Sequence, residues 1–376
     1  MKYVALADVA NIQLGKMLSP KSKTGTESFP YLRNQNVQWQ RFELAALATM
    51  DFSAREREKF RLLPGDLLVC EGGEPGRCAV WDGRIDNCFY QKALHRLRPK
   101  SGIADSQYLA LWIQFQALRG AFNDQNAKTT IAHLPLVRLE QLTVPDVPFD
   151  EQIGIAKALN VQLAEVEKAR QATVSQLEDV SKLADAVIMQ SLDEGTTGSY
   201  QLGQVLKEVK QGIGEHWQKY PVLGATRDGL APAKEPPGKH AVKYKPVFAG
   251  TVFYNPMRIL IGSIAFVDED DASGITSPDY VVLQGRERMV DSRWFYYWLR
   301  SPQGVQCINS LARGAVRERM LFNRLAEGEV VLPDYTTQRR ASAALKELNR
   351  MRTKLKQQFD EVALLPQKVL SQVFGN

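Results

Sequence analysis

Cysteine is scarce in this sequence, and its spacing does not suit a metal site. The chain has 376 residues but only four cysteines, and no two of them form a C-x-x-C pair. Cys70, Cys78 and Cys88 follow one another at intervals that zinc sites do not use, although His95 lies near them in the sequence. We therefore expect no bound metal and predict buried free thiols in a reducing cytoplasm.

Long hydrophobic runs are also absent. No stretch reaches the roughly 20 apolar residues that a membrane-spanning helix needs. Residues 1–15 contain no apolar segment of signal-peptide length before polar residues begin. These absences predict a soluble, cytoplasmic protein with no membrane partner.

The common catalytic and cofactor-binding motifs are missing as well. Residues 72–76 are rich in glycine but lack the G-x-G-x-x-G spacing of a dinucleotide site, and Pro75 favours a turn. The sequence has no phosphate-binding G-x-x-x-x-G-K-[ST], no H-E-x-x-H and no G-x-S-x-G. We therefore expect no catalytic residue and no cofactor in this chain.

The composition leaves a nucleic-acid partner open. Charged residues make up 24% of the chain and apolar residues 44%, which is ordinary for a globular protein. The formal net charge is +6 and the pI is about 9.0. A mildly basic chain is compatible with a polyanionic partner, but many basic proteins bind no nucleic acid, so charge alone does not decide.

The most informative feature present is an internal repeat. Residues 105–109 (DSQYL) match residues 291–295 (DSRWF), 186 positions later. The same offset aligns further pairs, which are Gly76 with Gly262, Trp112 with Trp298, Gln152 with Gln338, and Leu159 with Leu345. A repeat of this length predicts two copies of one domain and not a solenoid array.

Each copy ends in a predicted long helix. Apolar residues recur at alternating spacings of three and four over 156–187 and again over 341–373, which is a heptad pattern. Asp150 is a candidate N-cap of the first helix, Thr336 or Thr337 of the second, and Pro366 predicts a break. We expect the two helices to pair antiparallel as a coiled coil. The alternative is that each lies on its own domain.

Asn255-Pro256-Met257-Arg258 is similar to the Asn-Pro-Pro-aromatic loop with which adenine methyltransferases hold an extruded base. That loop needs an aromatic ring to stack on the base, and here Met257 and Arg258 occupy its last two positions. We interpret Arg258 as a DNA contact instead.

Several stretches together resemble the specificity subunit of a type I restriction-modification system, over essentially the whole chain. Residues 254–258, 262–264 and 274–282 resemble one type of target recognition domain, and residues 142–145 with 151–156 resemble the entry to a spacer helix. The second copy keeps Pro333 and Gln338 but has Thr337 where the first has Glu151.

The resemblance implies an α+β chain with two mixed α/β target recognition domains joined by two long helices that form an intramolecular antiparallel coiled coil. It implies double-stranded DNA as a partner, read as a bipartite asymmetric site. It also implies docking to two methyltransferase subunits, which carry S-adenosylmethionine, and motor-nuclease subunits can join. The boundaries that we predict are 1–148 and 196–334 for the recognition domains, 149–195 for the central helix and 335–376 for the C-terminal helix.

Candidate DNA contacts lie in polar loops at matched positions of the two domains, because arginine and amide side chains make bidentate contacts to base edges. The candidates are Arg33, Asn34, Gln35, Asn36, Arg77, Lys128, Thr129, Thr130, Arg227, Asp228, Asn255, Arg258, Ser263, Arg313 and Arg317. For any one of these residues, the competing interpretation is an ordinary solvated loop.

Two other functions remain possible at this stage. A stand-alone DNA methyltransferase or nuclease would need a cofactor loop or metal site that the sequence does not display. A coiled-coil scaffold without DNA would leave the different loops at matched positions of the two domains unexplained.

Overall fold

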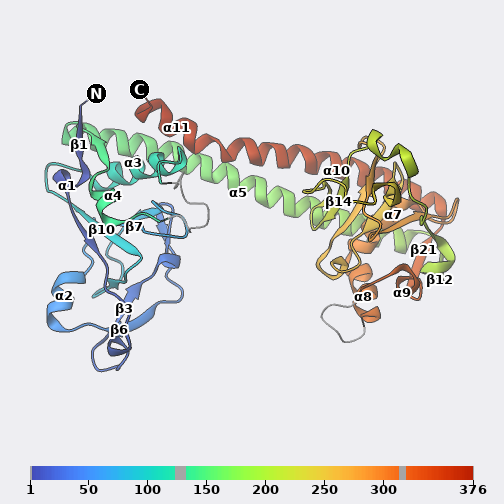
Figure 1. Cartoon of the computed structure of the whole chain (residues 1–376), viewed down its shortest axis with the longest axis horizontal. Coiled ribbons are helices and arrows are strands. Elements are labelled where there is room, and N and C mark those ends of the chain that lie inside the picture. Colours follow the sequence, from blue (N-terminus) through green and yellow to red (C-terminus); the bar gives the residue numbers. More distant parts are fainter. Residues whose placement is uncertain (1, 123–132, 313–318, 376) are drawn as a thin grey trace. The chain divides into compact units, whose positions relative to one another are not determined.

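The computed structural model describes residues 2–122, 133–312 and 319–375. The chain divides into two compact units, which are Met1–Gln171 with Asp360–Asn376, and Ala172–Phe359. Both units combine small sheets with helices (Figure 1), in agreement with the predicted α+β class. In the described parts of the chain, no helix is long and apolar enough to cross a membrane.

Each unit is built around a four-stranded antiparallel sheet with the same strand order. The order is β2-β10-β7-β8 in the first unit and β13-β20-β17-β18 in the second, so the topology confirms the predicted repeat. The strands are β2 (Ala10–Leu14), β7 (Leu67–Cys70), β8 (Cys78–Val80), β10 (Leu94–Pro99), β13 (Leu206–Glu208), β17 (Thr251–Tyr254), β18 (Ile264–Val267) and β20 (Val281–Gly285).

A second, two-stranded sheet joins the first and last strands of each domain. β1 (Tyr3–Ala5) pairs antiparallel with β11 (Thr143–Pro145), and β12 (Thr197–Gln201) pairs antiparallel with β21 (Glu329–Pro333). Each domain is therefore closed immediately before its long helix begins. The short helices are α1 (Leu6–Val9), α2 (Ala54–Phe60), α4 (Leu136–Glu140), α6 (Leu202–Val205), α8 (Pro302–Leu311) and α9 (Phe322–Leu325).

The repeated aromatic segment forms α3 (Ser106–Leu118) in the first domain and α7 (Ser292–Arg300) in the second. Asp105 and Asp291 cap these helices, because their carboxylates accept hydrogen bonds from the backbone N–H groups of Tyr108 and Trp294. The aromatic side chains of both helices pack in the cores.

The two domains differ in what is attached to this shared frame. The first carries a three-stranded sheet with its own small core, and the second carries two-stranded ribbons. The attached strands are β3 (Ser28–Leu32), β4 (Val37–Gln38), β5 (Arg41–Phe42), β6 (Ala48–Asp51), β9 (Phe89–Tyr90), β14 (Leu223–Thr226), β15 (Gly229–Pro232), β16 (Lys245–Val247) and β19 (Gly274–Thr276).

The long helices are α5 (Phe149–Glu194), α10 (Tyr335–Ala363) and α11 (Leu365–Phe374). The chain leaves the helix at Leu364, and Pro366 follows at the start of α11, so the predicted break is confirmed.

The predicted N-caps were wrong. Helix α5 already begins at Phe149, which leaves Asp150 inside its first turn. Helix α10 is capped by Asp334, whose carboxylate accepts from both the backbone N–H and the hydroxyl of Thr337. The N-cap must be the residue just before the helix. Only there is the backbone extended, so that the side chain can fold back and accept a hydrogen bond from the free N–H groups of the first turn.

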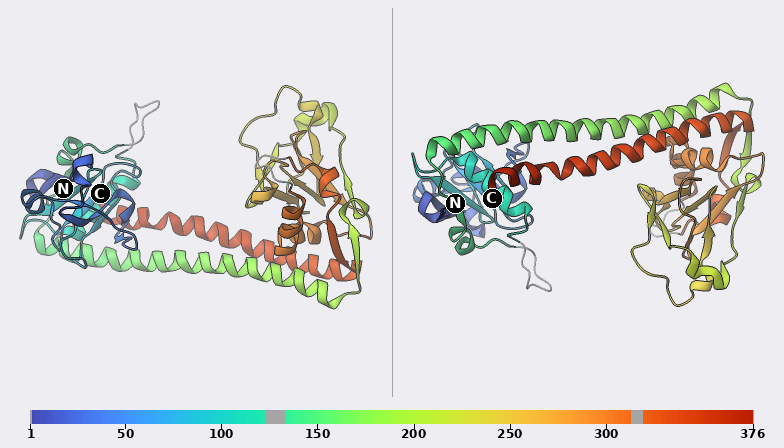
Figure 2. Two further views of the ribbon diagram at one scale, coloured as in Figure 1. Left: turned by 90° about the horizontal axis from the view of Figure 1, so that it is seen from below. Right: turned by 90° about the horizontal axis from the view of Figure 1, so that it is seen from above.

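In each unit, the start of one long helix and the end of another share a core. In the first unit, Ala156 and Leu159 of α5 pack in one cluster with Leu370 and Phe374 of α11. In the second unit, Ala341 and Leu345 of α10 pack in one cluster with Ala184 and Ile188 of α5. Figure 2 shows these parts of α5 and α10 side by side. Three pairs of these residues are 186 positions apart, namely Leu159 with Leu345, Ala184 with Leu370, and Ile188 with Phe374, so each domain meets its two helix segments in the same way.

Candidate functional site

Two predicted segments of the first domain lie against each other. The Asn34 side-chain amide donates to the Gly72 carbonyl at 2.7 Å. The Arg77 guanidinium donates to the Asn34 carbonyl at 3.0 Å. The turn around Asn34–Asn36 and the β7–β8 turn (residues 71–77) therefore form one continuous surface.

The chain that follows the third predicted segment is fastened to the same surface. The Leu134 N–H donates to the Glu71 carbonyl, and His133 forms an isolated bridge with Gly72. The Nε2 atom of buried His95 lies 2.9 Å from the Leu134 carbonyl oxygen, so it must donate. Burial lowers the pKa of His95, which keeps this anchor neutral at pH 7. The predicted contacts Lys128, Thr129 and Thr130 lie outside the described residues.

The four side chains of the Arg33–Asn36 segment have different roles in the structure. Asn36 is buried, with its amide oxygen accepting from the Arg33 N–H and its amide nitrogen donating to the Glu43 carbonyl. Arg33 donates to the Ala46 carbonyl, and Asn34 is committed to Gly72. Gln35 is the exposed member of the four. Three of these candidates thus hold the loop, and Gln35 projects from it.

The second domain brings its matched segments together with different contacts. The Ser263 hydroxyl donates to the Ala225 carbonyl at 2.7 Å, and the Arg227 Nε donates to the Ile261 carbonyl at 3.3 Å. Arg300 of α7 donates to carbonyls on both sides, those of Arg227, Gly262 and Ile264. Ser263 is buried and holds the two segments together, so its hydroxyl is not presented at the surface.

The chain after the last predicted segment is again fastened to the β17–β18 turn, because the Met320 N–H donates to the Pro256 carbonyl at 3.0 Å. The predicted contacts Arg313 and Arg317 lie outside the described residues. In both domains, two segments that are distant in sequence therefore meet at the turn between the third and fourth strands of the sheet, β7–β8 in the first domain and β17–β18 in the second.

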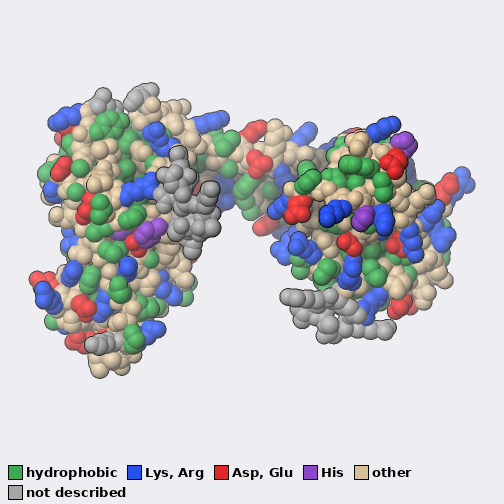
Figure 3. Space-filling view, in the orientation of Figure 1, with side chains coloured by type: hydrophobic (Ala, Val, Ile, Leu, Met, Phe, Trp, Pro, Cys, Tyr) green, Lys and Arg blue, Asp and Glu red, His purple; other side chains and the backbone are tan. Residues whose placement is uncertain are grey.

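The remaining candidate DNA contacts of the second domain differ in exposure and in whether their side chains already make a hydrogen bond. Asn255 is partly committed, since its side-chain oxygen accepts the Met257 N–H at 3.0 Å. Arg227, Asp228 and Arg258 are exposed. Figure 3 shows lysine and arginine side chains spread over the face of this unit seen in that view, among exposed hydrophobic ones.

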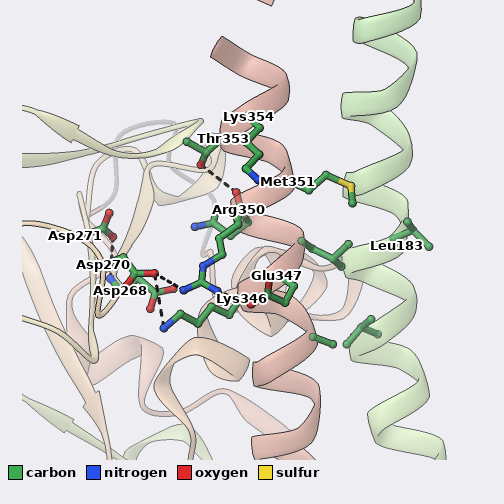
Figure 4. A pocket seen from close by; sticks show the side chains of 14 residues that line it. Leu183, Asp268, Asp270, Asp271, Lys346, Glu347, Arg350, Met351, Thr353 and Lys354 are labelled. Atoms are coloured by element: carbon green, nitrogen blue, oxygen red, sulfur yellow. Dashed lines mark hydrogen bonds and ion pairs between the residues drawn. The ribbon is translucent and has the colours of Figure 1, made fainter. Parts of the chain in front are cut away.

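Sequence reasoning missed an ionic contact between the second domain and α10. Residues 268–271 form an acidic loop after β18, and Figure 4 shows it facing Lys346 and Arg350 of the helix. Lys346 pairs with Glu269, and Arg350 with Asp270 at 2.9 Å. Asp268 is buried against Arg293 of α7, which itself donates to the Ser342 hydroxyl. No repeat or motif signalled this contact, because the first domain has no counterpart to the acidic run at the matched position.

Sequence alignment paired Gln152 with Gln338, and the structure shows what they do. The Gln152 side chain donates to the carbonyls of Ile103 and Val147 and accepts from the Asp105 N–H. Gln338 makes the same three bonds, to Met289, Pro333 and Asp291, each 186 positions later. Both side chains are buried, so each one fixes the first turn of a long helix to its own domain.

The predicted buried thiols are confirmed for three of the four cysteines, Cys70, Cys78 and Cys88, and all four are free. Burial raises the pKa of Cys70 to about 11 and that of Cys88 to about 12, so both are protonated at neutral pH.

Comparison with known proteins identifies the first half of the chain. Residues 1–176 match the family model described as the type I restriction modification DNA specificity domain. Residues 1–176 are therefore similar to a domain that serves DNA specificity in type I restriction-modification systems.

Solved structures extend the likeness in fold to the whole length of the chain. A type I restriction-modification S subunit from M. genitalium is 17% identical, with a TM-score of 0.52, and the match covers 99% of this chain and 96% of that one. A structure concerned with complex assembly and conformational transition of a type I system is 14% identical, with a TM-score of 0.67 and the same coverage. Comparison with curated proteins finds no match.

Proposed function

We propose that this chain is a non-catalytic specificity subunit of a type I restriction-modification system, and that it reads a bipartite, asymmetric DNA sequence, one half with each domain. Methyl transfer to adenine then takes place in two methyltransferase subunits that dock on this chain and hold S-adenosylmethionine. Motor-nuclease subunits can join the same assembly to cut DNA.

The observation that carries the proposal is that, in each domain, two segments distant in sequence meet at one turn of the sheet. The frames are equivalent, but the residues on the turns are not: the first turn is 71–77 (EGGEPGR) and the second is 255–263 (NPMRILIGS). Two equivalent frames with different reading surfaces suit two half-sites of different sequence, which together make an asymmetric site.

The chemistry of the exposed side chains supports reading of DNA. Exposed Gln35 can make a bidentate contact to adenine, and exposed Arg227 and Arg258 can contact guanine or phosphate. The net charge of +6 favours association with a polyanion. The loops that carry these exposed residues are held in place by hydrogen bonds from buried or half-buried polar side chains. These are the side chains of Asn34, Asn36 and Ser263.

A stand-alone methyltransferase is less well supported than a reading subunit. In an Asn-Pro-Pro-aromatic loop, the asparagine side chain must face an extruded base. Here the Asn255 side-chain oxygen is turned onto the Met257 N–H of its own turn, and the stacking ring is replaced by Arg258.

The decisive experiment is co-purification of the full chain with the methyltransferase of the same system, followed by mapping of methylated adenines in treated DNA. We expect a complex of two methyltransferases with one copy of this chain that marks a split, asymmetric site. Methylation by this chain alone would replace the proposal with an enzyme, and a complex that methylates without sequence preference would remove the reading role.

A further inference from the structure

The β17–β18 turn of the second domain displays large apolar side chains to solvent. Met257 is 59% exposed, Leu260 49% and Ile261 56%. Exposed apolar residues are common when single, but three on one short turn form a patch that usually marks a contact surface.

Hydrogen bonds within the turn hold this patch rigid. The Asn255 N–H donates to the Ser263 carbonyl, and the Ser263 N–H donates to the Arg258 carbonyl. Pro256 and Ile259 are buried beneath, and Gly262 adopts a φ of 83°, which lets the short helix at Ile259–Ile261 end sharply. The three apolar side chains are therefore presented in a fixed arrangement, which lowers the entropy cost of binding.

A small apolar hollow adjoins the patch. It has a volume of about 90 Å³ between the turn and α8, with Leu260, Val305 and Ile308 among its lining residues. Arg300 and the exposed Asn309 also line it. The hollow thus offers room for a methyl-sized apolar group next to polar side chains that can hydrogen bond.

The shared frame does not require this apolar surface. The matched turn of the first domain has no aliphatic side chain larger than proline, and its Glu74 is bonded to Trp39 and Arg77. The apolar side chains are therefore a property of the second domain alone, in the place where the two domains are expected to differ.

Two arginine side chains lie beside the apolar patch, and their positive charge indicates the kind of partner that binds there. Arg258 lies between the apolar residues in sequence and is exposed, and Arg227 is held against the tip by its bond to the Ile261 carbonyl. A surface with apolar groups and flanking arginines complements DNA, whose major groove carries one apolar group on its bases, the 5-methyl of thymine.

We propose that Met257, Leu260 and Ile261 read thymine in the half-site of the second domain by contacting its 5-methyl group. This inference rests on the proposed function and adds the base that the second domain selects. It follows that the second half-site contains at least one thymine whose methyl group contributes to recognition.

The test uses the complex of this chain with its methyltransferase, after the methylated site has been mapped. Each thymine of the second half-site is replaced in turn by uracil, which lacks only the 5-methyl group, and the affinity for the duplex is measured. For the natural chain, we expect at least one position at which affinity falls about fourfold, the value of one buried methyl group.

Variants then connect the methyl group to the turn. Because these side chains are exposed, Leu260→Ser and Ile261→Ser are expected to fold, and in them the thymine-to-uracil effect should disappear. Val331→Ser, which alters an exposed aliphatic residue of β21, should keep the effect. Replacement of thymine by uracil in the first half-site should change the affinity for DNA equally in the natural chain and in the turn variants.

Two results would overturn the inference. One is a second half-site that tolerates uracil in place of thymine at every position, on both strands. The other is a turn variant that loses the methyltransferase while its uracil effect persists, which would make the patch a protein-docking surface. Failure of the proposed function would appear earlier, as the absence of sequence-specific methylation by the natural complex.

Discussion

At the scale of single residues, equivalent positions in the two halves have retained structural roles where their neighbours have changed. Gln152 and Gln338 each join a helix start to the segment of chain that leads into that helix and to the N-cap of the aromatic helix. A side-chain amide suits this place because it offers two donors and an acceptor at once. Sequence alone matched the two glutamines but did not show that they are buried.

We predict that Gln338→Leu lowers the free energy of unfolding by about 2–3 kcal/mol, because it leaves two carbonyls and the Asp291 N–H without partners. Chemical denaturation measures the loss, and hydrogen exchange should locate it at the starts of α7 and α10. The exposed Gln306 of α8 provides a matched control, since Gln306→Leu should change stability by less than about 0.5 kcal/mol.

Gln35 is the residue of the first domain best placed to read a base, because it is exposed on a loop whose other members hold it rigid. We predict that Gln35→Ala weakens binding about tenfold or more when the first half-site is natural, and has no effect once that half-site is scrambled. An equal loss on all DNA sequences would point to a phosphate contact instead.

At the scale of elements, the end of a long helix packs at the equivalent place in each domain, but the side chains that make the contact differ. Phe374 of α11 packs among Tyr108, Trp112 and Phe115 of α3. In the second domain, the equivalent residue is Ile188 of α5, and a buried bond from Trp294 to Ser191 adds to the contact. The break at Pro366 produces a separate helix α11 that carries this aromatic contact.

Removal of the aromatic contact should release α11. We expect Phe374→Ala to cost about 3 kcal/mol of stability, the usual loss for a buried phenylalanine. Leu364→Ala, at the exposed residue of the break, should cost little by comparison. Retained protection of α11 in hydrogen exchange of the Phe374 variant would contradict this assignment.

The acidic loop predicts a dependence of stability on pH. Burial alone would raise the pKa of Asp268, but its hydrogen bonds to Arg293 and to the Glu269 N–H lower the pKa below its usual 3.8. A carboxylate with a lowered folded-state pKa contributes stability above about pH 4, and the contribution disappears as the pH falls through the folded-state value.

Asp268→Asn should therefore cost about 3 kcal/mol at pH 7, because it removes the nearest, buried anion paired with Arg293 and leaves the more distant, exposed Glu269, and the difference from the natural chain should shrink below pH 4. Denaturation at pH 7 and pH 3 measures both values. Asp279→Asn, at an exposed pair with Arg319, supplies the control with little effect at either pH.

At the scale of the whole molecule, a single helix belongs to both units. Helix α5 runs unbroken from Phe149 to Glu194, and the division between the units falls within it, after Gln171, and within α10, after Phe359. In the proposed function, this continuity sets the number of base pairs between the half-sites.

We predict that seven residues inserted after Gln171 and seven after Phe359 lengthen the spacer of the methylated site by about three base pairs, since seven helical residues add about 10 Å. Five-residue insertions rotate the helix faces by about 140° and should abolish methylation. Mapping of methylated adenines distinguishes the results, and an unchanged spacer with full activity would refute the role of α5 in spacing.

The sequence alone determined the repeat, the long helices and the break at Pro366, because these depend on local periodicity and backbone chemistry. Tertiary structure alone decided which polar side chains remain exposed. Asn36 and Ser263 have the same side-chain chemistry as DNA contacts but are turned inward, since buried backbone groups in their loops needed partners. Met257, Leu260 and Ile261 have apolar side chains of the kind that usually fills a core, and only the packing of the turn over Ile259 leaves them at the surface.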